Sequence, residues 1–155
     1  MFQKDLELKD FINIEDWQKL QDSLSEVIEI TLRTFSLDAK LLTRTSCPNY
    51  LCDEILPRIS KYSSFSALCL SEINVENLKE IKKETDIKCP FDTDCFVIPI
   101  RAVGDKIIAY LILGPIILKS RRDISEYAEE AKKYGIELEQ LEDTLIAVNV
   151  FSYNK

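Results

Sequence analysis

The chain has 155 residues, the size of one ordinary domain with a single hydrophobic core. Hydrophobic residues make up 46% of it and glycine occurs three times, which excludes a disordered chain and a glycine-rich phosphate-binding loop. The net charge of −7 disfavours direct nucleic-acid binding, and the absence of histidine removes the commonest general base, so we expect no enzyme and no cofactor.

The apolar runs of the sequence are all far shorter than the roughly 20 residues that cross a bilayer. The first residues, MFQKDLELKD, also lack the apolar core of a signal peptide. We therefore expect a soluble, cytoplasmic chain without membrane insertion. Five cysteines, an odd number in such a chain, are expected to be reduced thiols.

The first predicted element is an amphipathic helix that begins after Asn13, a suitable N-cap residue. Apolar side chains follow at spacings of three and four, which is the pattern of a helix with one apolar stripe. The members of this stripe are Ile14, Trp17, Leu20, Leu24, Val27 and Ile28.

Two short strands joined by a tight turn are predicted next, in EITLRTFSL and LLTRTS. In the first, Ile30 and Leu32 alternate with the polar residues Thr31 and Arg33. The region from 48 to 85 then mixes helical spacing with proline and serine, which indicates short helices and turns.

The second hairpin is the clearest structural prediction. CFVIPIRAV and KIIAYLILGPIIL flank a Gly104-Asp105 turn, and a short strand around DIKCP would extend the sheet. The strand after the turn is apolar at nearly every position, so we expect both of its faces to be covered and the strand to be central or part of an interface.

Two helices are predicted at the C-terminus, in DISEYAEEAKKYG, closed by Gly135, and in ELEQLEDTLIAVNVFS. The second carries apolar residues at spacings of three and four. This stripe fits either a short coiled-coil seam of a parallel dimer or a helix packed on its own domain. Its members are Leu138, Leu141, Leu145 and Val148.

Together these elements predict one α+β domain over residues 1–155. Its antiparallel sheet has about five strands, with helices inserted between strands 2 and 3 and helices at both termini. This is the connectivity of a PAS- or GAF-like sensory domain. Residues 136–155 would form a C-terminal helix that leads to an output domain.

Four stretches resemble the PocR-type sensory domain, a PAS-like ligand-binding module of bacterial and archaeal signalling proteins. They are FINIEDWQKLQDSLSEVIEI, KCPF ahead of FVIPI, GDKIIAYLILGPIIL and YGIELEQLEDTLIAVNVFS, and the resemblance covers nearly the whole chain. It implies a signal-input domain that binds a small organic molecule and controls a histidine kinase, a second-messenger enzyme or a DNA-binding regulator.

The resemblance also implies a cysteine-rich patch with a Cys-His-x-Gly-like stretch ahead of the Pro-Ile strand. Cys47, Cys52 and Cys89 fall in the corresponding regions, but Pro90 stands in place of the histidine and Asp92 in place of the glycine. The fold implied by the resemblance survives these departures, whereas a ligand preference cannot be carried over.

We place the ligand pocket between the sheet and the helices of residues 48–85. Cys69, at helical spacing from Phe65, is expected to be core. The Asp92 and Asp94 side chains could contact a ligand or cation, but aspartate more often satisfies turn backbone groups. The predicted ligand-binding residues are Cys47, Tyr50, Cys52, Cys89, Phe91 and Cys95.

The cysteines admit other interpretations. Four thiolates could ligate a metal or an iron-sulfur cluster, although four and five residues intervene within the pairs where metal motifs usually have two. The pair Cys47–Cys52 or Cys89–Cys95 could instead sense redox state. A third function is a ligand-free dimerisation module. We assign no metal.

Overall fold

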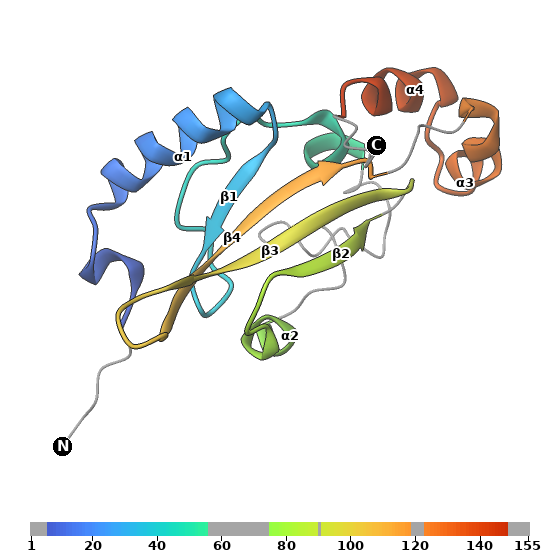
Figure 1. The fold of residues 1–155 in the computed structure, drawn as a ribbon. Helices are drawn as coiled ribbons and strands as arrows, with labels where there is room; N and C mark the ends of the chain where they lie inside the picture. The colour runs from blue at the N-terminus through green and yellow to red at the C-terminus, as the bar shows by residue number, and fades with distance from the viewer. Residues whose placement is uncertain (1–5, 56–74, 90, 119–122, 149–155) are drawn as a thin grey trace, which may run out of the picture.

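The computed structural model describes residues 6–55, 75–89, 91–118 and 123–148. Within them an open antiparallel sheet has the strand order β1-β4-β3-β2 (Figure 1). All three strand pairs are antiparallel. The strands are β1 (Leu32–Phe35), β2 (Thr85–Cys89), β3 (Thr93–Arg101) and β4 (Ile107–Ile116).

Helices lie at both ends of this sheet. In Figure 1, α1 runs beside β1 at one edge, and α3 and α4 lie together near the end of β4. The helical segments of the described residues are η1 (Leu8–Asp10), α1 (Ile14–Ile28), the π-helix η2 (Leu51–Ile55), α2 (Val75–Glu80), η4 (Ile124–Tyr127), α3 (Ala128–Lys133) and α4 (Leu138–Ile146).

The second predicted hairpin is confirmed. β3 and β4 pair on either side of a turn in which Gly104 and Asp105 have φ values of 83° and 61°. Two consecutive residues with positive φ match the right-handed twist of the flanking strands, which explains the Gly-Asp sequence. β4 lies between β1 and β3, so the prediction of a central strand is also confirmed.

The predicted strand in residues 41–46 does not form. Leu41 and Ser46 make only isolated bridges to β1, so the described sheet has four strands rather than about five. The Arg44 carbonyl accepts hydrogen bonds from side chains of α1 instead of from a strand. The helical segments η2 and α2 therefore lie between β1 and β2 of this smaller sheet.

Helix α1 begins where predicted, and the Asn13 side chain accepts a hydrogen bond of 2.8 Å from the Glu15 amide. The apolar stripe of this helix is exposed over much of its length. Leu20, Leu24 and Val27 are 56%, 44% and 80% exposed. The fully buried side chains of α1 are polar: Gln18, Gln21 and Ser25.

Gln21 explains this inversion, because it is the centre of a buried hydrogen-bond network. Its amide nitrogen donates to the Leu32 carbonyl and, at 2.8 Å, to the Ser46 hydroxyl. Its amide oxygen accepts from Thr34 at 2.6 Å and from Thr43 at 3.1 Å. The polar face of α1 therefore packs on β1 and on the segment after it, whose backbone also bonds to β1 at Leu42 and Ser46.

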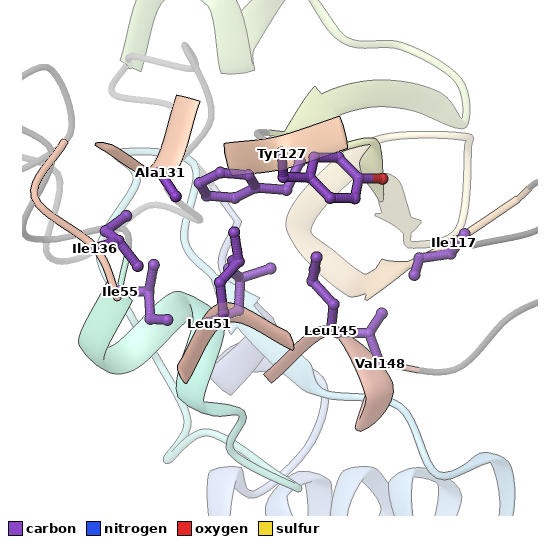
Figure 2. Packing of buried hydrophobic residues seen from close by; sticks show 10 residues of the cluster. Leu51, Ile55, Ile117, Tyr127, Ala131, Ile136, Leu145 and Val148 are labelled. Carbon is purple, nitrogen blue, oxygen red and sulfur yellow. The ribbon is translucent and has the colours of Figure 1, made fainter. Parts of the chain in front are cut away.

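Helices form within both predicted C-terminal stretches, with Gly135 at a φ of 68° after α3. The predicted helix of residues 136–155 is shorter in the structure, because α4 ends at Ile146, and residues 149–155 lie outside the described ranges. Leu141, Leu145 and Val148 are buried against η2 and Tyr127 (Figure 2). The apolar stripe of α4 therefore packs on its own domain, and these side chains are not available for a coiled-coil seam.

Two predictions fall on residues outside the described ranges. Cys69 and the segment 56–74, where part of the predicted pocket wall falls, lie outside the described residues. In the part of the chain that is described, no helix has the length and apolar character needed to cross a membrane.

One substitution on each side of α1 tests whether its polar side is the buried one. Gln21→Leu removes the partners of several buried polar groups and should lower the free energy of unfolding by about 2–4 kcal/mol. Leu24→Gln changes an exposed residue of similar helix propensity and should change it by less than about 0.5 kcal/mol. Urea unfolding measures both variants, and the opposite ranking would contradict the burial of the polar face.

Candidate functional site

One face of the sheet, which we call the inner face, carries a continuous apolar cluster. It receives side chains from all four strands, from the loop after β1 and from α2. The Tyr110 hydroxyl donates to the Ile81 carbonyl at 3.2 Å and so holds the segment after α2 against the sheet. The buried members are Phe35, Ala39, Leu78, Cys89, Cys95, Val97, Tyr110 and Ile112.

Arg33 is a buried cation on this face. It pairs with Ile112 in the sheet register and is 7% exposed. Its guanidinium lies 3.8 Å from the Asp53 carboxylate of η2. Burial raises the pKa of the Asp53 carboxyl, and the Arg33 charge opposes that rise. The alternation of polar and apolar residues in the sequence does not indicate that Arg33 is buried.

The structure brings two predicted site residues together at the end of the inner face. The sulfur atoms of Cys89 on β2 and Cys95 on β3 are 3.5 Å apart, and both are reduced thiols. Cys95 has no exposed surface, and Cys89 is 9% exposed. Both cysteines are therefore part of the apolar cluster, and their sulfur atoms contact each other directly.

An irregularity in β4 lies opposite Cys95. Asp94 pairs with Ile116 and Phe96 pairs with Leu113, so the Gly114-Pro115 dipeptide faces the single residue Cys95. Gly114 has a φ of 136°, and a Cβ atom there would lie 2.9 Å from the Cys95 sulfur and 2.8 Å from the Asp94 carbonyl. Only glycine fits this contact, because any side chain would meet the backbone of β3.

The turn between β2 and β3 links the cysteines to the C-terminal helices. Phe91 and Asp92 both have positive φ, 62° and 60°. Phe91 is buried against Tyr127 with the rings edge to face, and the Tyr127 hydroxyl donates to the Asp92 carboxylate at 3.0 Å. Phe91 thus packs with the C-terminal cluster of Figure 2 rather than with the inner face.

The other predicted site residues are placed differently. Cys47 is exposed, and its carbonyl accepts a hydrogen bond from the Thr31 hydroxyl. Tyr50 is 43% exposed, and its hydroxyl accepts from Gln140 of α4 at 2.6 Å. Cys52 lies in η2, but its side chain is outside the description. The structure therefore gathers Cys89 and Cys95, while Cys47 and Tyr50 lie at the surface.

Asp94 is the buried carboxylate nearest to the cysteine pair in the sequence. It is 5% exposed, and the Lys88 ammonium approaches its Oδ1 atom to 2.6 Å. Burial raises the pKa of the Asp94 carboxyl, while the hydrogen bond from Lys88 acts in the opposite direction. That interaction also raises the pKa of Lys88.

Arg101 lines a surface hollow of about 480 Å³ that the sequence did not indicate. Its guanidinium donates to the carbonyls of Lys82 and Asp105, so it joins the end of β3 to the segment after α2 and to the hairpin turn. The hollow also receives Lys79, Lys82, Lys106, Asp38 and Asp105. Its cations are balanced in part by carboxylates, which makes it a solvated charged surface.

Metal ligation gains no support within the described part of the chain, where no group of three or more cysteine, aspartate or glutamate side chains is arranged to hold an ion. Cys89 and Cys95 supply two thiols at most. A closed tetrahedral thiolate site needs four ligands.

The described residues form an α+β domain with an open antiparallel sheet and an apolar inner face, and segments next to that face contact the C-terminal helices. The family model described as the sensory domain found in PocR matches residues 10–155. The chain therefore belongs to the PocR sensory-domain family. No curated protein matches it.

Substitution of Gly114 tests the contact behind Cys95. Gly114→Ala should lower the free energy of unfolding by roughly 3 kcal/mol or more, because the new methyl group meets the backbone of β3 at a positive φ. Gly135→Ala also has a positive φ but meets no atom, so about 1–2 kcal/mol is expected. Equal losses in urea unfolding would contradict the tight contact.

The raised pKa of Asp94 predicts a pH dependence of stability. The folded state then binds the proton more tightly than the unfolded state, so the contribution of Asp94 is fully present below its ordinary pKa of 3.8 and is lost as pH rises through the folded pKa. Asp94→Asn cannot ionise. Its stability relative to the parent should therefore rise between about pH 3.5 and pH 7 in urea unfolding.

The control for this experiment is Asp143→Asn, at an exposed position of α4. It removes a carboxyl that is exposed rather than buried, so the comparison isolates the effect of burial at Asp94. A relative stability of Asp94→Asn that falls with rising pH would mean that the ion pair with Lys88 outweighs the burial of the carboxyl.

Proposed function

We propose that this chain is the ligand-sensing input domain of a signalling or regulatory protein and that it binds a small organic molecule against the inner face. Membership of the PocR sensory-domain family over residues 10–155 is the observation that carries this proposal. The ligand site would lie between the sheet and the helical region of residues 48–85, with Cys89 and Cys95 at one end.

Arg33 supports a more specific version of the proposal. Ligand pockets are mostly apolar with a few polar groups that orient the ligand, and Arg33 is a buried cation on an otherwise apolar face. Its ion pair with Asp53 is long, at 3.8 Å. An acidic group on the ligand would replace Asp53 with a closer, charge-assisted hydrogen bond, so we propose a small organic acid.

The signal would leave through the C-terminal helices. α4 packs on η2, the segment that carries Asp53, and η4 holds the Phe91-Asp92 turn. A ligand that prefers one packing of these elements shifts their population, which an output domain joined through α4 would read. A kinase, a second-messenger enzyme or a DNA-binding regulator is the proposed class of output.

Two alternative functions are kept as hypotheses. A cysteine-ligated metal or iron-sulfur sensor would need Cys52 or Cys69, whose side chains lie outside the description, and elemental analysis of protein purified without oxygen would test it. A dimerisation module is favoured by one specific observation, the exposed apolar stripe of Leu20, Leu24 and Val27 on α1. That stripe could pair with a second copy.

Thermal shift with matched pairs of small carboxylic acids and their amides tests the sensing proposal. An acid at about 100 times its Kd adds about 2.7 kcal/mol to the stability, which raises Tm by roughly 5–10 °C in a chain of this size. The amide should give a smaller shift. Arg33→Met should abolish the preference for the acid, and the exposed control Arg44→Met should keep it.

Three outcomes would count against the proposal. An acid that stabilises Arg33→Met as strongly as the parent would remove Arg33 from the site. An amide that stabilises as strongly as its acid would overturn the acidic ligand class. A chain that responds to no compound, but sediments as a dimer that Leu24→Gln dissociates, would support the dimerisation module.

A further inference from the structure

We propose that Cys89 and Cys95 form a redox modification site, in which the two thiols are reversibly oxidised to one disulfide within the chain. Their sulfur atoms are already in contact at 3.5 Å. A disulfide has a bond length of about 2.05 Å, so the two atoms need to approach by roughly 1.5 Å. The modification needs no bound ligand, although the two cysteines lie at one end of the ligand site proposed above, and it would give the domain a second input.

The strand register shows that such a disulfide would be strained. Cys89 pairs with Thr93 and Cys95 pairs with Ile87, so the cysteines are diagonal neighbours on the same face of the β2–β3 hairpin. Diagonal neighbours usually have Cα atoms about 7–8 Å apart, whereas a disulfide spans at most about 6.8 Å. Closing the bond therefore requires the strands to shift, and strained disulfides are readily reduced and suited to regulation.

The sheet offers a place for that shift. Gly114 and Pro115 face Cys95 with a register irregularity, so the ladder between β3 and β4 is interrupted at this residue. Bulges of this kind redirect the side chain opposite them. Gly114 has no side chain, so no Cβ atom of β4 lies against the Cys95 sulfur, and Cys89 lies on the β2 side. The absence of that atom leaves the Cys95 side chain unhindered by residue 114.

The two cysteines differ in solvent exposure, and this difference determines which thiol is oxidised first. Cys89 is 9% exposed and meets a hydroperoxide first, while Cys95 is fully buried. The Cys89 sulfur attacks the terminal peroxide oxygen, the O–O bond breaks, and the alcohol or water leaves with the thiol proton. The resulting sulfenic acid is attacked by the Cys95 sulfur, the S–O bond breaks, and water leaves with the second proton.

The balance is two thiols and one hydroperoxide converted to one disulfide, one alcohol or water from the peroxide, and one water. A dithiol reductant reverses the modification by exchange, passing two electrons and two protons back to the cysteines.

The cysteines bracket a turn that contacts the C-terminal helices. Phe91 and Asp92 lie between them in sequence, and both contact Tyr127, through a ring contact with centroids 6.1 Å apart and a hydrogen bond of 3.0 Å. Figure 2 shows Tyr127 beside the cluster that includes Leu145 and Val148. Drawing β2 and β3 together at the base of the turn therefore displaces the part of the turn on which η4 and the C-terminal cluster rest.

The test uses the full chain with Cys47, Cys52 and Cys69 replaced by alanine, so that Cys89 and Cys95 are the remaining thiols. Hydrogen peroxide should remove both thiols, and peptide mapping should find one disulfide between residues 89 and 95 that dithiothreitol reverses. Hydrogen exchange of residues 123–148 should differ several-fold between the reduced and oxidised forms. The same mapping on the parent chain guards against a folding defect of the triple variant.

A matched control removes only the second thiol. With Cys95→Ala, Cys89 should stop at the sulfenic acid, and hydrogen exchange of residues 123–148 should not respond to peroxide. Three results would overturn the proposal: oxidation of Cys89 with Cys95 still a thiol, a disulfide that joins two chains, or a disulfide between 89 and 95 that leaves hydrogen exchange of the C-terminal helices unchanged.

Discussion

The two-sided pairing of β4 is the constraint on which the rest of the structure depends. β4 hydrogen-bonds to β1 on one side and to β3 on the other, and its side chains contribute to the inner face, where Tyr110 also holds the segment after α2. The same strand places Gly114 against Cys95, so the position of the cysteine pair follows from the irregularity in β4. A sequence that is apolar at nearly every position is what such a doubly covered strand requires.

The edges of the sheet pose the opposite problem, because an edge strand leaves backbone donors and acceptors without a neighbour. At β1 the solution is polar: Gln21 bonds to the Leu32 carbonyl and to side chains of the segment after β1. α1 therefore turns its amides toward the protein and leaves Leu20, Leu24 and Val27 toward solvent. The buried network of Gln21 therefore takes the place of apolar packing along this part of α1.

Two segments, η2 and the turn between β2 and β3, connect the inner face with the C-terminal helices. η2 carries Asp53 beside Arg33 and also packs against α4. The turn between Cys89 and Cys95 contacts Tyr127 through both of its positive-φ residues. We therefore propose that a change of packing on the inner face, by a ligand or by a disulfide, reaches the C-terminal helices through these two segments.

Much of the element order could be predicted from the sequence, because turn chemistry and periodicity are local properties. Asn13, Gly104-Asp105 and Gly135 each lie at the helix start, hairpin turn or helix end that their residue type favours. The family resemblance likewise rests on contiguous stretches, and the family model confirms it over residues 10–155. Asp92, which replaces a glycine, could also be recognised as a positive-φ position from the resemblance.

Only the tertiary structure decided which side of each element is buried. The apolar stripe of α1 is largely exposed while the helix packs through Gln21, and Arg33 is buried although it is a charged residue in an alternating strand. Of the predicted site residues, Cys89 and Cys95 are in contact, while Cys47 and Tyr50 lie at the surface. Periodicity shows that a helix or strand has an apolar side. Which side is buried depends on the groups that pack against the element, and these come from distant parts of the chain. Their need for hydrogen-bond partners can bury a polar side instead.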